Sequence, residues 1–156
     1  MPTDVWVAGG IALAQGIVGG ALTWIGPWYK NLRKPWFQPP DWAFGPAWSV
    51  ILALAAWAGV VAWRAAGTEG ERADVILLFA VNGVFFVLWT PLFFAVKRPD
   101  WALVEVVFLW ASVLALVVGL WPISPFASLL VTPYLAWVTF ASVLNRAIVR
   151  LNAPFP

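Results

Sequence analysis

Few side chains in this sequence could carry out acid–base, nucleophilic or metal chemistry. The 156 residues contain no Cys and no His. This composition excludes disulfides, thiol nucleophiles, His general bases, His or Cys ligation of haem iron, and the usual zinc sites. The sequence therefore favours ligand binding over ordinary acid–base catalysis.

Two polar residues inside long apolar segments are the first candidates for a function. Asn82 would be costly in lipid unless it faced the protein interior, and we expect it to line a pocket, with a packing role as the alternative. Glu105 is the only carboxylate within such a segment. It follows Asp100 by five residues, about 7 Å along a helix axis. We therefore expect Glu105 near the membrane surface, solvated, and in a structural role.

Aromatic residues form the larger group of candidates. Thirteen Trp are more than two membrane interfaces can absorb, so several are expected in the middle of helices. Helical spacing places them in three groups, each on one face: Trp48 with Leu52 and Ala55; Asn82 with Phe86 and Trp89; and Tyr134 with Trp137, Ala141 and Leu144. If these faces converge, they form a mostly apolar cleft that suits planar hydrophobic ligands. Simple packing is the alternative for each group.

Composition indicates the elements that must position these residues. The chain is 63% hydrophobic and 10% charged, with a mean hydropathy of +0.87, whereas soluble domains carry about 25% charged residues. Five apolar runs are long enough to cross a bilayer as helices: residues 5–25, 46–66, 75–96, 101–120 and 126–149. We predict an all-α fold, a single domain over residues 1–156 built as a five-transmembrane-helix bundle.

The basic residues predict the orientation of the bundle. Two of them, Arg64 and Arg72, lie on the side of the N-terminus. The other seven lie on the opposite side: Lys30, Arg33, Lys34, Lys97, Arg98, Arg146 and Arg150. The positive-inside rule then predicts a cytoplasmic C-terminus and an external N-terminus. Because the net charge of +2 comes from these short loops, we expect no nucleic-acid partner.

The connection between the first and second runs, residues 26–45, is the one long loop. It contains four prolines and six aromatic residues. Proline restricts the backbone, and a bulky apolar loop of this kind is expected to fold over the mouth of the bundle as a lid. An aromatic belt packed on lipid headgroups is the alternative.

Two local patterns predict packing and capping. Small residues repeat every four positions in the first run, at Ala8, Ala12, Gly16 and Gly20. Such a stripe lets helices approach closely, within the chain or across a dimer. The tetrapeptide Pro-Asp-Trp-Ala occurs at 40–43 and again at 99–102. We expect Asp41 and Asp100 to cap the helices that follow them.

Motifs distributed over all five runs carry a family resemblance. They are Trp28 to Leu32, Lys34 to Trp36, Pro39-Pro40, Phe44, Pro46, Trp48, Trp89 to Phe94, Trp101 to Leu103, Pro133 to Trp137, and Leu144-Asn145. Together they resemble the TspO/MBR family, the tryptophan-rich sensory proteins or translocator proteins. The resemblance implies a five-helix membrane bundle, often dimeric. It also implies a pocket beneath the first loop that binds porphyrins, haem-like tetrapyrroles and synthetic hydrophobic ligands, and sterols in some members.

The resemblance and the helix faces together predict the residues that contact a ligand: Tyr29, Trp36, Trp48, Asn82, Phe86, Trp89, Tyr134 and Trp137. No catalytic residue, metal ligand or obligatory cofactor is expected. Phe86 stands where the family usually has a second amide, and Arg146 stands where animal members have the Tyr of a proposed sterol motif. Sterol binding is therefore not implied, and without His a metal-free porphyrin fits better than ligated haem iron.

Three functions remain open at this point. The first is a membrane receptor or sensor in which tetrapyrrole binding regulates tetrapyrrole or stress-related processes. The second is a light- or oxygen-dependent porphyrin-degrading enzyme, an activity attributed to some family members, with Trp48 and Trp137 as redox participants. The third is an accessory subunit of a larger pigment-handling membrane complex. We expect a bacterial inner membrane as the location, and membrane lipid, a tetrapyrrole and a second copy of the chain as partners.

Overall fold

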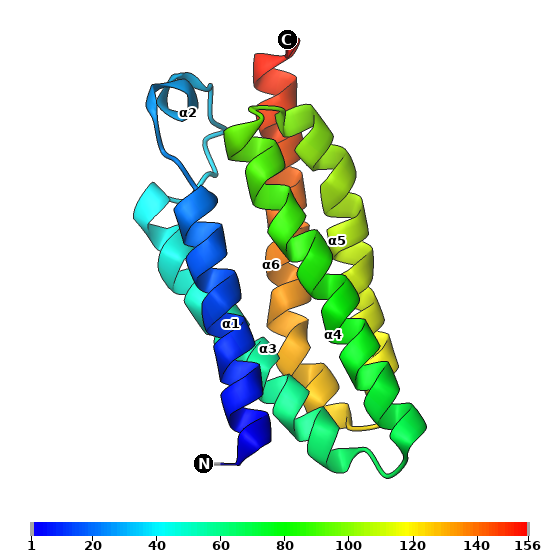
Figure 1. Cartoon of the computed structure of the whole chain (residues 1–156). Helices are drawn as coiled ribbons and strands as arrows, with labels where there is room; N and C mark the ends of the chain where they lie inside the picture. The colour runs from blue at the N-terminus through cyan, green and yellow to red at the C-terminus, as the bar shows by residue number, and fades with distance from the viewer. Residues whose placement is uncertain (1, 156) are drawn as a thin grey trace.

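The computed structural model describes residues 2–155, and within them the chain forms helices and no strand. Five helices are long and apolar enough to cross a membrane, as Figure 1 shows. They are α1 (Thr3–Leu22), α3 (Phe44–Ala65), α4 (Glu69–Thr90), α5 (Pro99–Leu120) and α6 (Pro125–Asn152). Three short elements complete the chain: the helix α2 (Pro27–Asn31), the 3₁₀ turn η1 (Asp41–Ala43) and the π-helical turn η2 (Pro91–Ala95). The prediction of an all-α, five-helix bundle is confirmed.

Each of the five long helices packs against at least two of the others. Helix α6 packs against α5 and α3, while α4 packs against α5, and α1 packs mainly against α3 with a smaller contact to α4. The two termini lie at opposite ends, and α2 lies at the same end as the C-terminus (Figure 1). The long connection expected to be a lid therefore lies at the end that carries the seven basic residues.

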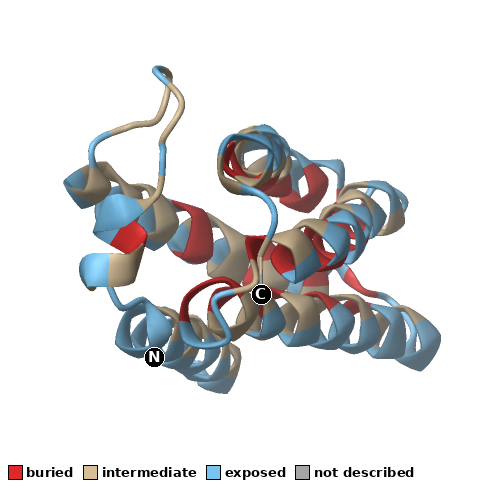
Figure 2. Cartoon of the chain, turned by 90° about the horizontal axis from the view of Figure 1, so that it is seen from above, coloured by how far each residue is buried: buried red, intermediate tan, exposed pale blue. Residues whose placement is uncertain are grey.

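Burial is uneven among the five helices. Buried residues gather on the faces that the helices turn toward one another, and exposed residues cover the outside (Figure 2). Helix α5 buries nine residues, whereas α1 buries none. Helix α1 therefore contributes little to the core, and its inward side chains border space instead of filling it.

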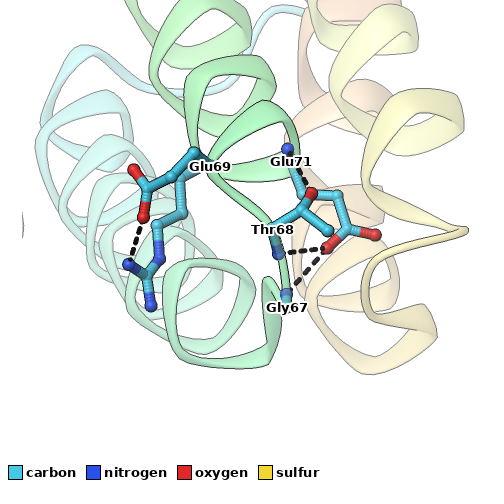
Figure 3. A network of polar contacts seen from close by, with 5 residues as sticks. Gly67, Thr68, Glu69 and Glu71 are labelled. Atoms are coloured by element: carbon cyan, nitrogen blue, oxygen red, sulfur yellow. Dashed lines mark hydrogen bonds and ion pairs between the residues drawn. The ribbon is translucent and has the colours of Figure 1, made fainter.

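Helix α4 begins earlier than its apolar run predicts. The expected start was residue 75, but the helix starts at Glu69 because a capping box holds its first turn (Figure 3). The Glu71 amide donates to Thr68 Oγ1 at 3.1 Å, and Glu71 Oε2 accepts from the amides of Gly67 at 2.7 Å and Thr68 at 3.2 Å. These bonds satisfy amides that the first helical turn leaves free. Hydropathy marks the membrane-crossing part of this helix and not its beginning.

Helix α1 ends at Leu22, three residues before its apolar run ends. Gly26 and Pro27 then start α2, with Gly26 at the N-cap and Pro27 at the first position. The connection between α1 and α3 therefore covers residues 23–43, and we call this segment the lid. It includes a helical turn that the sequence analysis did not predict.

Capping by Asp41 and Asp100 is not observed. Neither the turn that begins at Asp41 nor helix α5 has a side-chain cap. Asp100 is the second residue of α5, too far inside the helix to cap it, and it pairs with Arg98 at 2.8 Å between Nε and Oδ1. Asp41 accepts a hydrogen bond from the Tyr29 hydroxyl at 3.1 Å. In the first copy of the tetrapeptide, Asp41 therefore stabilises the lid through Tyr29. In the second copy, Asp100 stabilises the start of α5 through Arg98.

Candidate functional site

A cavity of about 430 Å³ lies beneath the lid and between the five long helices. This volume is in the range of about 300–1,000 Å³ that is usual for ligand pockets. Most of its surface is apolar. One wall is formed by α1, where Gly16, Gly19 and Gly20 line the cavity. The glycines leave room because no side chain extends from them.

The opposite wall is aromatic and is centred on Trp48. The Trp48 ring packs edge-to-face against Phe86, Tyr134 and Trp137, with ring centroids at 5.2, 6.0 and 6.2 Å. These residues come from α3, α4 and α6. The three helix faces that the sequence analysis identified therefore converge, and Trp48, Phe86 and Trp137, together with Trp89, line the cavity.

The lid supplies the polar mouth of the cavity. The Tyr29 hydroxyl donates to Asp41 Oδ1 and accepts from Gln38 Nε2, both at 3.1 Å. Lys34 Nζ lies 4.1 Å from the centre of the Tyr29 ring and 4.0 Å from Asp41 Oδ2. Burial, followed by the negative charge of Asp41, raises the pKa of Tyr29 from its ordinary 10.0 to about 12. The hydroxyl is therefore neutral at physiological pH and can hold both bonds.

Contacts with α6 and η2 hold the lid on the bundle. Tyr29 is only 6% exposed and packs against Phe94, with ring centroids 5.5 Å apart. The backbone of Arg33 makes two reciprocal hydrogen bonds with the side chain of Asn152, its amide donating to Oδ1 and its carbonyl accepting from Nδ2, each at 2.8 Å. The loop is therefore folded onto the bundle, as the lid hypothesis predicts.

Several polar atoms of the cavity-lining residues have no hydrogen-bond partner within residues 2–155. They are Gln38 Oε1, Trp89 Nε1 and Trp137 Nε1, and each is buried. Buried polar groups in proteins are nearly always hydrogen-bonded, so each exception needs an explanation. These three atoms belong to residues that line the cavity, although each atom is itself covered by protein.

Three of the eight predicted contact residues do not line the cavity. Trp36 is 95% exposed at the tip of the lid. Tyr134 is buried behind Trp48. Asn82 is buried, but its Nδ2 donates to Ser112 Oγ on α5 at 3.0 Å, which means that its amide is engaged between helices. The other five, Tyr29, Trp48, Phe86, Trp89 and Trp137, do line it.

Glu105 is less accessible than its distance from the start of α5 suggested. It was expected to be solvated, but it is 8% exposed and neither carboxylate oxygen has a hydrogen-bond partner within residues 2–155. The reason is that Glu105 lies on the inward side of α5, in a stretch that also buries Ala102, Val106 and Leu109. Glu105 itself does not line the cavity.

Gln15 and Phe44 are among the lining residues that were not predicted as ligand contacts. Gln15 is the one amide in the first apolar run, and its polarity within that run was the available signal. Phe44 was seen only as part of the loop and its motif. It packs against Trp137, with ring centroids 5.9 Å apart, from the first turn of α3.

The stripe of small residues on α1 has two uses. A Cβ at Gly16 would lie 3.5 Å from Leu52 Cδ1, which is ordinary contact distance, so α1 approaches α3 closely at this position, as predicted. A Cβ at Gly20 would meet nothing within 4 Å. At Gly20 the missing side chain leaves the cavity open, a use that the stripe alone did not indicate.

Comparison with known proteins places this architecture in a family. Residues 8–151 match the TspO/MBR family. A tryptophan-rich sensory protein of Cereibacter sphaeroides is 39% identical over 85% of this chain and 82% of its own length. The tryptophan-rich protein TspO of Chlorobaculum tepidum is 34% identical over 92% of each chain. The translocator protein of Sus scrofa is 34% identical over 92% of this chain and 83% of its own length.

The match covers all five long helices and the lid. With five helices of membrane-crossing length, the molecule is an integral membrane protein. The family suggested by the sequence motifs is the one that the comparison identifies: this chain belongs to the TspO/MBR family.

Proposed function

We propose that this protein is a membrane receptor for porphyrin-type tetrapyrroles or similar flat hydrophobic molecules, which bind in the cavity beneath the lid. The observation that carries the proposal is the cavity of about 430 Å³ with an aromatic wall built from Trp48, Phe86, Trp89 and Trp137. Aromatic side chains supply contact area for a flat apolar ligand.

The distribution of polarity orients such a ligand. Lys34 lies over the Tyr29 ring and beside Asp41, next to the mouth although outside the lining itself, while the middle of the cavity is lined by Trp48, Phe86 and Trp137. A carboxylate is costly in the bilayer core. Acidic side groups of a tetrapyrrole therefore stay at the mouth near Lys34, and the macrocycle lies among the aromatic rings.

A sensory role requires two states that bind the ligand differently. The lid supplies a candidate pair, closed and open, because it is held by a small number of hydrogen bonds and aromatic contacts. Helix α1 buries no residue, so its outer surface is free to contact a second copy of the chain or another membrane protein. We propose that ligand binding favours the closed lid and that a homodimer or a larger membrane complex detects this change, which regulates tetrapyrrole or stress-related processes.

Titration with protoporphyrin in nanodiscs tests the proposal. Quenching of tryptophan fluorescence should saturate with a Kd in the micromolar range, about −8 kcal/mol. The Trp48→Ala variant should bind less tightly by about 1 to 3 kcal/mol, because Trp48 is the centre of the aromatic wall. Affinity is taken from the midpoint of the titration, since removal of a Trp also changes the amplitude.

The matched control is Glu105→Gln. Glu105 is buried but does not line the cavity. The variant should therefore bind protoporphyrin as tightly as the parent does. Trp137→Ala is a less direct test, because Trp137 also borders an apolar groove on the outside of α3 and α6, and its removal would join that groove to the cavity. Equal binding by the parent and Trp48→Ala, or loss of binding only in Glu105→Gln, would place the site elsewhere.

The same titration distinguishes a receptor from a porphyrin-degrading enzyme. A receptor leaves the porphyrin absorbance constant in the dark and under illumination. A decrease of that absorbance under light, and only with the parent protein, would favour degradation.

A further inference from the structure

We infer that Gln15 determines specificity by hydrogen-bonding a neutral polar group at the buried edge of the ligand. This inference rests on the proposed function and assigns a role to the residue that borders the cavity from α1. Gln15 lies seven residues before the end of α1 at Leu22, about 10 Å below the lid. It is therefore at the inner end of the cavity, beyond the polar mouth.

Several other polar side chains in or beside the cavity wall form hydrogen bonds within the protein. Thr23 Oγ1 donates to the Gly19 carbonyl at 2.7 Å, and Ser49 Oγ donates to the Gly45 carbonyl at 2.9 Å. The amide of Asn145, in the orientation that satisfies both its ends, donates to the Pro99 carbonyl and accepts from the Leu103 amide, each at 3.1 Å. Asn82 is turned toward Ser112. Gln38 Oε1 also lacks a partner within residues 2–155, but it belongs to the lid at the mouth, so Gln15 is the amide available at the inner end of the cavity.

The position of the Gln15 amide depends on Gly83 in α4. A Cβ built at Gly83 would lie 2.9 Å from Gln15 Nε2, closer than Cβ contacts in proteins allow. Only glycine at position 83 therefore lets the amide rest against α4 at this point. The amide is fitted into a notch of the facing helix, on the side of the cavity that Phe86 also lines.

The chemistry of the amide defines the ligand group. A Gln side chain offers two N–H donors and a carbonyl acceptor and carries no charge. At this depth in the bilayer a charged partner would be costly, so the group that it binds is neutral, such as a ketone, a hydroxyl or an N–H. The site therefore suits a flat amphiphile with its acids at the mouth and a neutral hydrogen-bonding group at the opposite edge.

Two porphyrins that differ at that edge test the inference. Protoporphyrin carries vinyl groups opposite its propionates, and the diacetyl derivative of deuteroporphyrin carries ketones at the same positions. The parent protein should bind the diacetyl compound about three- to tenfold more tightly than protoporphyrin, the gain from one hydrogen bond. Gln15→Leu, which keeps the size of the side chain, should remove this preference, so that the two porphyrins bind with affinities within about twofold of each other.

Gly83→Ala provides a second variant that leaves Gln15 in place. The added Cβ must displace the flexible end of the Gln15 side chain, so the preference should fall in this variant as well. In the Gln15→Leu background, Gly83→Ala should have no further effect on the preference, because the displaced amide is gone.

The outcomes separate the two proposals. If the parent binds neither porphyrin, the proposed function is wrong and this inference fails with it. If the parent binds both and Gln15→Leu keeps the full preference for the diacetyl compound, the proposed function stands and the role of Gln15 is refuted. An equal affinity of the parent for both porphyrins also refutes it.

Discussion

The clamp between the lid and α6 should control how often the cavity opens. The side chain of Asn152 holds the backbone of Arg33 through two hydrogen bonds of 2.8 Å. These bonds join the lid to the last turn of α6, far from it in the sequence. We predict that Asn152→Ala opens the lid more often without unfolding the bundle, because the long helices do not depend on this contact.

The magnitude follows from the two bonds. A hydrogen bond within a protein contributes about 0.5–1.5 kcal/mol net, and these two are partly exposed, so water can replace them in the open state. Their joint loss should reduce the free energy that favours the closed lid by about 1–2 kcal/mol. This change raises the population of the open lid about five- to thirtyfold. Tyr29 stays buried against Phe94, and this contact prevents complete release of the lid.

Hydrogen exchange measures this opening directly. The lid contains backbone hydrogen bonds from the amides of Lys30, Leu32, Gln38 and Ala43. Exchange at these amides reports the local opening equilibrium, so their protection should fall by the same factor in Asn152→Ala. Amides in the middle of α5 should exchange as they do in the parent.

Leu151→Ala is the matched control, because Leu151 is the neighbouring residue on the same turn and is 43% exposed. It should leave lid exchange unchanged. If lid protection in Asn152→Ala stays within about twofold of the parent, the clamp does not hold the lid, and closure must be assigned to the aromatic contacts alone.

Three further predictions concern the lid hydroxyl, the α1 stripe and the topology. Because the pKa of Tyr29 is raised from 10.0 to about 12, the neutral hydroxyl is favoured in the closed lid; its stabilisation is complete below pH 10 and is lost as the pH rises toward 12. Ligand retention should therefore be constant at neutral pH and decrease above pH 10 in the parent, and Tyr29→Phe should bind more weakly at neutral pH but lack the part of the alkaline decrease that is due to this hydroxyl. Gly16→Ile should lower both the melting temperature and porphyrin affinity, because the added side chain must occupy space beside Leu52 and in the cavity. Unchanged melting and binding would show that this face of α1 is not closely packed. A reporter that is active only in the periplasm should be active when fused at Gly70 and inactive at the C-terminus, and the reverse result would invert the predicted topology.

Much of the fold was predictable because hydrophobic length is the dominant signal in a membrane. Each of the five apolar runs became a helix, since a lipid-exposed backbone must satisfy its own hydrogen bonds. The ends of the helices were less predictable. The early start of α4 depends on the Thr68–Glu71 capping box, and at the end of α1 the Thr23 hydroxyl donates to the Gly19 carbonyl. These bonds are local and polar, and hydropathy does not detect them.

The aromatic wall was predictable from helical periodicity, but the direction of the Asn82 side chain was not. Trp48, Phe86 and Trp137 each lie on the apolar face that their helix turns inward. Asn82 lies four residues before Phe86 on the same side of α4, yet its amide is directed to Ser112 on α5. A helical face is wide enough to border both a cavity and a neighbouring helix, and periodicity does not distinguish the two.

Gln15 shows why a residue that lines the cavity from α1 could not be predicted from the sequence. Helix α1 buries no residue, so its sequence shows no inward stripe of large apolar side chains from which a pocket residue could be identified. Its inward positions are glycines that create space, and one amide whose place is set by Gly83 on another helix. Side chains that fill a core determine stability, whereas side chains that border a cavity determine what fits there. Apart from Gly16, which contacts α3, cavity-facing substitutions on α1 should therefore change ligand preference before they change the stability of the bundle.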